Sequence, residues 1–589
     1  MTYFFTKRAG LRPTTHRLVL SLLSIALAQH QVFAVSGTIS AATYGVGASN
    51  NGSDNAANLQ KALSSGAQVV TITSGSYNIG PAMVTVPVGV TLRGASGVEL
   101  KSVSGTGPIL DMLDHSTVTG IKFDGAAGNV AHTDGVFGAT LIGLVSAGGQ
   151  SDTGVSGVTI ANCEFDNSTL DGVYIEHVGS AKGAAPTVVE HCKIDSVFQG
   201  IEADFSSNIH VYHNTVKNTK SAGMMFWGNV RDGSNWVARN GRNIDCEYNT
   251  VIDAGGSVVN APGGAGIWSS GCQNIVFSHN KVDGAQDGDV DMEWCCQGQM
   301  TDNTLSRSAY GGVAMFFSSE DIVIADNHIT NNRKSSTNGP INAGVYFAYP
   351  GKDQFSGDLG YKNVVVYNNT VNNTANGAWK QRLAWVNSNT SRNIQFYGNT
   401  ATGDAPIYVG GDPPMVATGT NNFTLENLAQ TPLSVCLPEI GDPSFEMPAI
   451  AAGTSAQDPQ DTFEQYCTFV GTAGIASNGS NLGNPNAPDG TQVGYVQGQG
   501  SISQSVWFPG GKWKIALYAA GQDAGNQKAL RVLVDGRSLN DFSVGQSFGS
   551  VATRSVTLRE GNHVITFKGI AGKSNDVKAF IDKVSFIPA

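Results

Sequence analysis

An asparagine followed two residues later by an apolar residue recurs through the middle of the chain, and this repeat constrains the fold more than any other feature. The spacing runs from the low twenties to about forty residues, as expected when loops of different length are inserted between similar units. The repeated asparagines are Asn214, Asn249, Asn280, Asn303, Asn327, Asn369 and Asn399. A repeat of this period predicts a stacked, solenoid-like architecture.

Short segments that open with glycine or a close equivalent lie between the asparagines, and they share one frame. They occupy residues 172–175, 200–203, 223–226, 266–269, 312–315 and 344–347. A short strand, a turn, another strand and an asparagine turn in each unit indicate an all-β fold, a right-handed parallel β-helix, in which each coil buries its apolar residues against the next. A β-sandwich with accidental repeats is the alternative, and the regular frame disfavours it.

The start of the repeat region has its own pattern. A glycine-rich segment at 44–52 leads into a short helix that ends near Leu63, with Asp54 as the expected N-cap, and apolar strands follow. This arrangement resembles the N-terminal cap of the pectate-lyase-like superfamily of β-helices. The resemblance covers residues 38–430 and implies a catalytic β-helix domain that acts on polysaccharides.

Both ends of the chain differ from the repeat. At the N-terminus, basic residues precede an apolar run at 18–28 and a small-residue site at 32–34, so residues 1–34 are predicted to be a signal peptide. We expect a secreted, extracellular protein without a membrane span, because the apolar run is too short. Residues 431–460, rich in Pro, Gly and Asp, are the expected linker. Residues 461–589 are expected to form a jelly-roll-like β-sandwich similar to carbohydrate-binding modules, or a structural or oligomerising cap.

The net charge of -11 limits the partners. It argues against nucleic acid. It also disfavours a polyanionic substrate, unless a metal or a local basic cleft offsets the repulsion. The expected partner is a polysaccharide, and the identity of the sugar and the oligomeric state stay open.

The segment 288–294 places acidic residues at every second position: Asp289, Asp291 and Glu293. In a regular strand the three carboxylates share one face, while Val290 and Met292 point the other way. Like charges this close are unfavourable unless a cation, a shared proton or a sugar accounts for them. The segment is therefore a candidate site.

The same frame predicts an outward stripe made of the residues two and four positions after each leading glycine or its equivalent. Its members are Tyr174, Glu176, Glu202, Asp204, Met225, Trp227, Trp268, Ser270, Asp291, Glu293, Ala314, Phe316, Tyr346 and Ala348. Carboxylates between large aromatic side chains suit a sugar-polymer groove, since aromatic faces stack on pyranose rings. The alternative is that inserted loops cover the aromatics and make them a small satellite core.

Glycoside hydrolysis by inversion needs two carboxyl groups about 6.5 to 9.5 Å apart, and residues two apart on one strand face lie at the lower edge of that window. We therefore expect Asp291 and Glu293 to be the acid/base pair, with Asp289 and Asp287 strengthening the local field. Glu202 and Asp204 form a second candidate pair, with Glu176 one coil away. Binding of the substrate is expected from Trp227, Trp268, Tyr174, Glu176, Tyr346 and Phe316.

Two rival functions remain. A calcium-dependent lyase acting on a uronate polymer would use the acids of 287–293 as the cation site. Its candidate bases, Lys220, Arg231, Arg239, Arg242 and Arg307, lie off the stripe. A non-catalytic glycan-binding surface protein is the other alternative. The hydrolase, which we favour because the stripe is acidic and aromatic, needs no metal or cofactor.

The eight cysteines are expected to be structural. Cys163 and Cys192 fall at equivalent turns of successive coils, as do Cys272 and Cys295, so each pair either stacks or forms a disulfide. Cys436 and Cys467 are a third candidate pair. No cluster of histidines and cysteines has zinc-ligand spacing.

Overall fold

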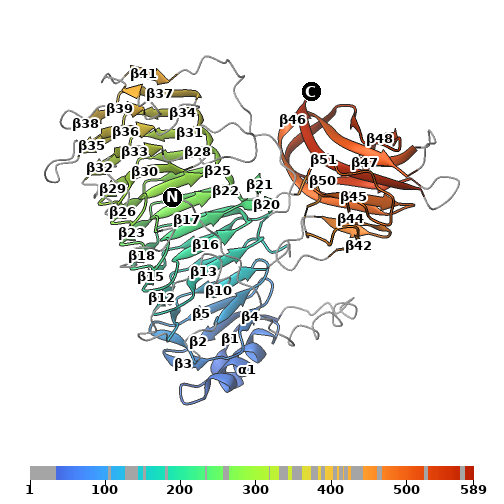
Figure 1. Ribbon diagram of the computed structural model, residues 1–589. Coiled ribbons are helices and arrows are strands. Elements are labelled where there is room, and N and C mark those ends of the chain that lie inside the picture. The colour runs from blue at the N-terminus through green and yellow to red at the C-terminus, as the bar shows by residue number, and fades with distance from the viewer. Residues whose placement is uncertain are drawn as a thin grey trace.

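The computed structural model describes residues 35–589 except 104–107, 127–142, 150–153, 180–183, 233–234, 240, 256–263, 317–318, 331–342, 348–360, 373–381, 387–391, 402–406, 410–414, 417–421, 426–441, 447, 460–466, 523–527 and 571–576. Within these ranges the strands form three long sheets, visited in the order A, B, C by successive strands of each coil (Figure 1). Neighbouring strands in each sheet are parallel, except at the last pair of sheets A and C. The right-handed parallel β-helix predicted from the repeat is confirmed.

The strands of each sheet follow one another along the helix axis. Sheet A contains β1 (Val35–Ser40), β2 (Ala67–Ile72), β5 (Thr91–Gly94), β8 (Thr117–Thr119), β11 (Thr159–Ala161), β14 (Thr187–Glu190), β17 (Ser207–Tyr212), β22 (Gly241–Glu247), β25 (Cys272–Ser278), β28 (Cys296–Thr301), β31 (Glu320–Ala325), β34 (Lys362–Tyr367), β37 (Arg392–Tyr397) and β41 (Asn422–Leu425). Sheet B contains β3 (Gly75–Ile79), β6 (Val98–Ser102), β9 (Lys122–Asp124), β12 (Glu164–Asp166), β15 (Lys193–Asp195), β18 (Thr215–Lys217), β23 (Thr250–Ile252), β26 (Lys281–Asp283), β29 (Thr304–Ser306), β32 (His328–Thr330), β35 (Thr370–Asn372) and β38 (Thr400–Ala401). Sheet C contains β4 (Val84–Val86), β7 (Leu110–Met112), β10 (Gly143–Gly148), β13 (Asp171–Glu176), β16 (Ile201–Asp204), β19 (Met224–Trp227), β24 (Ile267–Ser270), β27 (Val290–Glu293), β30 (Gly311–Phe316), β33 (Ala343–Phe347), β36 (Arg382–Val386), β39 (Ile407–Val409) and β40 (Met415–Val416). A short hairpin joins β20 (Asn229–Asp232) to β21 (Asn235–Arg239).

The repeated asparagines form a buried ladder at the turn before sheet B. Each of the first six donates from its side-chain Nδ2 to the Oδ1 of the asparagine in the next coil, at 2.8–3.2 Å. The same Oδ1 accepts the backbone N–H of the preceding asparagine at 2.9–3.0 Å. The side chains therefore continue the hydrogen bonding of the strands through a turn where buried backbone groups would otherwise lack partners.

The glycines that open the sheet C segments line the interior. A Cβ added at Gly312 would overlap the side chain of Ile329, and one at Gly172 would lie 2.9 Å from Ile194. In the coil of β10 the same position holds Leu144, which belongs to the hydrophobic core. The chain therefore turns at this residue, and the glycine and the apolar residue after it both face inward.

The first coil is covered by η1 (Ala41–Tyr44) and α1 (Gly52–Leu63). Leu59 and Leu63 of α1 pack into the end of the core, so the helix shields apolar residues that have no coil before them. The N-cap of α1 is Asn51, whose side chain accepts the N–H of Asp54 at 2.9 Å. The prediction of Asp54 as N-cap is therefore wrong by three residues, and Asp54 lies inside the first turn.

An antiparallel unit with its own core follows the β-helix (Figure 1). Its strands are β42 (Ser455–Gln457), β43 (Thr468–Val470), β44 (Ala473–Ser477), β45 (Gln492–Gln497), β46 (Ser501–Gly521), β47 (Lys528–Val534), β48 (Arg537–Ser543), β49 (Gly549–Ala552), β50 (Val556–Gly569) and β51 (Lys578–Pro588). Phe445 is fully buried in this core, and β42 pairs with β44. Part of the expected linker is therefore part of this unit, which we call the C-terminal unit and which begins near residue 442.

The predicted disulfide pairs are not formed. Cys163, Cys192, Cys272, Cys295 and Cys467 carry reduced thiols, and all are buried. The first two lie at equivalent turns and stack, as the alternative prediction had it. Cys436 and the predicted signal peptide, residues 1–34, lie outside the described residues. Among the helices that the structure describes, none is long and apolar enough to cross a membrane.

Candidate functional site

The register of sheet C confirms the predicted stripe as two adjacent rows on its outer face. The first row is Tyr174, Glu202, Met225, Trp268, Asp291, Ala314 and Tyr346. The second row is Glu176, Asp204, Trp227, Ser270, Glu293 and Phe316. Neighbouring members of a row are about 4.8 Å apart and the two rows about 7 Å apart. Ala348 lies outside the described residues.

Asp289 does not belong to these rows. It occupies the inward-facing position held by glycine in most coils and by Leu144 in another, because Ile267 pairs with the residue after it, Val290. Its side chain is fully buried, and its backbone N–H donates to Gly311 at 3.1 Å. The prediction that three carboxylates of this segment share one face is therefore wrong for Asp289, since the alternation breaks where the chain turns into sheet C.

The upper acidic group consists of Asp287, Asp291 and Glu293. Asp291 is buried between Trp268 and Ala314, whereas Asp287 and Glu293 are half-buried. Burial raises the pKa of Glu293 to about 8, and the negative charge of Asp287 adds to this; the hydroxyl of Ser270, which donates to Glu293 at 3.2 Å, lowers it. Burial raises the pKa of Asp287 to about 6, and burial and the charge of Glu293 raise the pKa of Asp291 well above its usual value.

The lower acidic group lies three to four coils toward the N-terminus and contains Asp171, Glu176, Glu202 and Asp204, all buried. The hydroxyl of Tyr174 donates to Asp204 at 3.3 Å. Burial raises the pKa of Asp171 to about 7 and the pKa values of Glu202 and Asp204 well above normal, and neighbouring carboxylates raise the latter two further. Burial and mutual repulsion thus both disfavour the ionised forms of Glu202 and Asp204.

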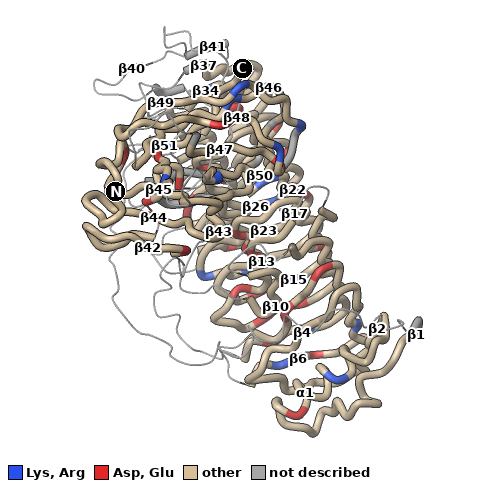
Figure 2. The backbone as a smooth tube through the Cα atoms, turned by 90° about the vertical axis from the view of Figure 1, so that its right-hand side faces the viewer, with Lys and Arg blue, Asp and Glu red and all other residues tan. Residues whose placement is uncertain are grey.

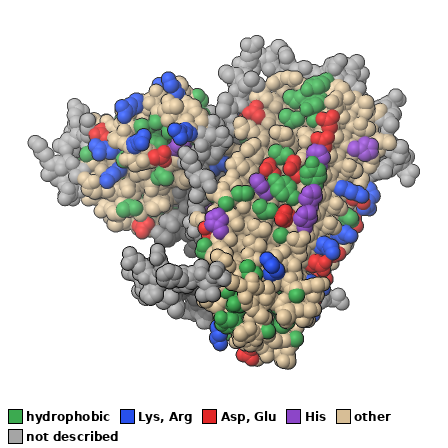
Figure 3. Space-filling model, turned by 180° about the vertical axis from the view of Figure 1, so that it is seen from behind, with side chains coloured by type: hydrophobic (Ala, Val, Ile, Leu, Met, Phe, Trp, Pro, Cys, Tyr) green, Lys and Arg blue, Asp and Glu red, His purple; other side chains and the backbone are tan. Residues whose placement is uncertain are grey.

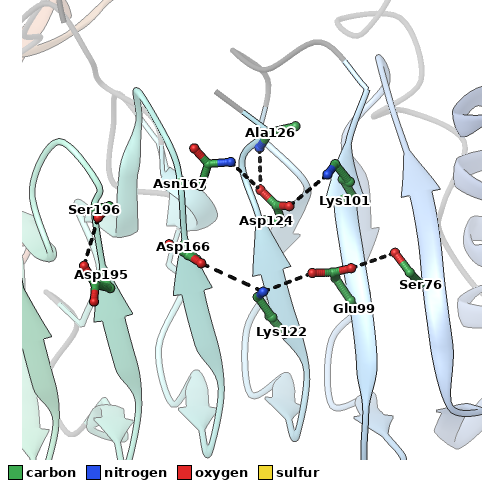
Figure 4. A network of polar contacts seen from close by, with 10 residues as sticks. All are labelled: Ser76, Glu99, Lys101, Lys122, Asp124, Ala126, Asp166, Asn167, Asp195 and Ser196. Atoms are coloured by element: carbon green, nitrogen blue, oxygen red, sulfur yellow. Dashed lines mark hydrogen bonds and ion pairs between the residues drawn. The ribbon is translucent and has the colours of Figure 1, made fainter. Parts of the chain in front are cut away.

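Acidic residues on sheet B are paired differently. Lys122 bridges Glu99 at 3.1 Å and Asp166 at 3.9 Å, and Lys101 pairs with Asp124 at 3.1 Å (Figure 4). Among the described residues, by contrast, no Lys or Arg forms an ion pair with the sheet C carboxyl groups Asp171, Glu202, Asp204, Asp287, Asp291 and Glu293. Stacked acids that carry protons instead of counter-cations are typical of functional sites.

The aromatic residues of the stripe fall into two packed groups. Trp268 is buried and meets half-buried Trp227 edge to face, with ring centroids 5.7 Å apart. On the other side of the upper acidic group, Tyr346 is buried against Phe316 and Tyr310, which are half-buried. Trp268 and Tyr346 therefore belong to small satellite cores and Tyr174 is buried as well, whereas Trp227 and Phe316 remain partly open to solvent.

Several residues of the site escaped the sequence analysis. Asp171 and Gln199 precede the regular part of their strands, where the period of two gives no signal; Gln199 donates its side-chain N–H to Glu202 and its backbone N–H to Asp171. Tyr310 and Trp385 join the second aromatic group from a turn and a later strand. Trp385 lies in the same row as Tyr346, one coil farther on, so extending the repeat to the next coil of the sequence would have identified it.

The predicted lyase bases belong to elements other than the strands that carry the stripe. Arg307 lies beyond sheet B, paired with Asp283 at 2.5 Å, and Arg242 belongs to sheet A. Lys220 precedes β19, and Arg231 and Arg239 belong to the hairpin of β20 and β21. Within the part of the chain that the structure describes, no group of three or more His, Cys, Asp or Glu is arranged to hold a metal ion.

Comparison with solved structures gives similarity to a mannuronan C-5 epimerase A-module from Azotobacter vinelandii (14% identity, 63% of this chain and 97% of that one, TM-score 0.37). The Dettilon tailspike protein is 10% identical, with 93% and 94% covered and a TM-score of 0.44. The surface adhesin PfbA of Streptococcus pneumoniae is 12% identical, with 67% and 98% covered and a TM-score of 0.44. A search of curated proteins gave no match.

A family model gives the assignment that these distant likenesses do not. The model described as right handed beta helix region matches residues 88–240 and 237–427, which together make up more than half of the chain. The architecture of three parallel sheets agrees with this match throughout. The protein therefore belongs to the right-handed β-helix family.

Proposed function

We propose that the protein is an extracellular polysaccharide-degrading enzyme, a glycoside hydrolase that uses Glu293 and Asp291 as its acid/base pair. The observation that carries this proposal is the second row of sheet C, in which Trp227, Ser270, Glu293 and Phe316 follow one another in successive coils. A half-buried acid thus lies between two partly open aromatic residues, about 5 to 10 Å from each. Such an arrangement suits a sugar held by its apolar face beside a proton donor.

The protonation states fit the two roles. With a pKa of about 8, Glu293 holds its proton at neutral pH and can donate it to the leaving glycosidic oxygen. Burial and the charge of Glu293 also raise the pKa of Asp291, so the pair loses its two protons one after the other, and Asp291 would act as the general base in the singly ionised form. Their separation of about 7 Å across the strand suits an inverting mechanism, in which the ionised group activates water.

The remaining residues of the stripe are assigned supporting roles. Trp227 and Phe316 contact the sugar, while Trp268 and Tyr346 hold these aromatics in place from beneath. Glu202, Asp204, Glu176 and Tyr174 form a second polar region along the same face that contacts further sugar units. We keep Glu202 and Asp204 as the second candidate pair.

The test is a panel of purified polysaccharides incubated with the full-length protein, following new reducing ends and near-ultraviolet absorbance, with and without EDTA. We expect reducing ends without absorbance, unaffected by EDTA. Glu293→Gln should lower the rate by about 10²- to 10⁴-fold while binding is retained. Glu164→Gln, an exposed acid of sheet B, is the matched control and should leave the rate unchanged.

The rival functions give different results. Absorbance that disappears with EDTA would show a calcium-dependent lyase and overturn the hydrolase. Binding without cleavage of any polymer, unchanged in Glu293→Gln, would show a non-catalytic glycan-binding protein.

A further inference from the structure

Three exposed basic side chains share one face of the C-terminal unit. Lys512 and Lys514 alternate along β46 and therefore point to the same side of the sheet. On the neighbouring strand β50, Thr557 lies opposite Lys512, so Arg559, two residues farther on, faces the same side. Antiparallel neighbours are about 5 Å apart and alternate residues about 7 Å apart, which brings the three cations into one small area.

Two arginines extend this area. Thr553 bonds to Ile515 through both its backbone N–H and its side chain, at 2.9 and 3.0 Å, and this places the exposed Arg554 beside Lys514. The guanidinium of Arg554 donates to the carbonyl of Ser538 at 3.3 Å, next to the exposed Arg537. We call Lys512, Lys514, Arg537, Arg554 and Arg559 the basic face.

No acidic residue of the described part of the chain forms an ion pair with the basic face. The ion pairs of the described C-terminal residues join Arg531 to Asp541 and His563 to Asp535, each at 2.7 Å. Figures 2 and 3 show Lys and Arg on both parts of the molecule. In Figure 3 several lie on the face of the C-terminal unit turned to the viewer, whereas the middle of the β-helix face carries Asp, Glu and His around a hydrophobic patch. A local excess of positive charge is thus maintained on a chain whose net charge is -11.

We propose that the basic face binds an anionic polysaccharide, one that carries carboxylate groups along an extended chain. Cations spaced about 5 to 7 Å apart on a strand face match charges repeated along a linear polymer, and both Lys and Arg pair with carboxylate. Ile587, 45% exposed, lies directly opposite Lys514 and offers an apolar surface for a sugar ring. This binding surface goes beyond the proposed hydrolase activity and does not require it.

The test measures the retardation of the full-length protein in native gels that contain polygalacturonate or uncharged dextran, together with sedimentation with phosphatidylglycerol vesicles. The variant is Lys512→Glu/Lys514→Glu. The control is Lys61→Glu/Lys281→Glu, which changes the net charge equally through exposed lysines of the β-helix. We expect polygalacturonate affinity to fall about tenfold or more in the first variant and to weaken with salt in the wild type, since exposed charges are screened.

Three results would overturn the proposal. The first is equal polygalacturonate affinity in the two double variants, with unchanged thermal unfolding. The second is retardation by dextran as strong as by polygalacturonate. The third is binding to the anionic vesicles without binding to polygalacturonate, which would point to a lipid surface. The hydrolase activity of Glu293→Gln does not affect any of these three binding results. Failure of the hydrolase proposal and failure of the binding proposal can therefore be told apart.

Discussion

At the scale of single residues, the asparagine ladder shows how one side chain can serve two coils at once. The side chain of Asn280 accepts the backbone N–H of Asn249 at 2.9 Å and donates to the carbonyl of Cys246 at 2.8 Å. It also donates to Asn303 in the next coil. All of these groups are buried, so each depends on the amide for its hydrogen bond.

We predict that Asn280→Ala lowers the free energy of unfolding by about 2–4 kcal/mol, because it leaves at least two buried backbone groups without partners. Asn274→Gly is the control: Asn274 is exposed, donates to Asn243 at 2.8 Å and has a left-handed φ of 53° that glycine tolerates, so its loss should cost less than about 1 kcal/mol. The measurement is urea unfolding followed by far-ultraviolet circular dichroism. Equal losses in the two variants would contradict the role given to the buried ladder.

The same scale shows what sequence patterns can and cannot predict. The ladder was predictable because an asparagine recurs at each turn, and the stripe because two rows keep one frame over seven coils. The inward orientation of the Asp289 side chain was not predictable, because it depends on the turn into sheet C, where the alternation of a regular strand does not apply. The burial of Trp268 could not be predicted either. The alternation of a strand indicates on which face of the sheet a side chain lies, but not whether neighbouring side chains cover it.

At the scale of elements, strands β13 and β16 place carboxyl groups opposite one another in adjacent coils, where water is largely excluded. The pKa of Asp171 is about 7, and the pKa values of Glu202 and Asp204 are raised well above their usual range. In the unfolded chain such groups titrate near pH 4. Between about pH 4 and pH 7 the folded state therefore binds more protons than the unfolded state, and stability decreases as the pH rises.

We predict that the double variant Glu202→Gln/Asp204→Asn reduces this pH dependence. Each carboxyl group that is protonated only in the folded state contributes a slope of about 1.4 kcal/mol per pH unit, so the wild-type slope between pH 5 and 7 should fall by roughly 1–3 kcal/mol per unit. Urea unfolding at a series of pH values measures it. Glu164→Gln, exposed on sheet B, serves as the control. A slope unchanged in the double variant would mean that these carboxyl groups ionise normally.

At the scale of the whole molecule, the chain builds two hydrophobic cores from separate stretches. The β-helix core draws on residues from the first coil to Phe396, and the second core draws on residues from Phe445 onward. Composition suggested a linker up to residue 460, because Pro, Gly and Asp are frequent there. A single buried aromatic and a three-residue strand, however, are enough to attach that segment to the C-terminal unit.

We predict that residues 442–589 fold when expressed alone, whereas residues 461–589 are strongly destabilised. The shorter fragment lacks Phe445, and loss of a buried phenylalanine side chain costs about 3–5 kcal/mol. Thermal unfolding by calorimetry and the dispersion of amide NMR signals would compare the two. If the fragments proved equally stable, Phe445 and β42 would be peripheral to this unit.

The stacking of near-identical coils has a consequence for evolution. Each coil contacts only the coils on either side, so inserting or deleting a whole coil disturbs two interfaces that can re-form with each other. Such an event lengthens or shortens the outward rows of sheet C by one step without altering their composition elsewhere. The number of coils thus sets the length of the outward rows. A β-helix of this kind can change the length of polymer that it spans by duplicating a coil, without substitutions elsewhere on its surface.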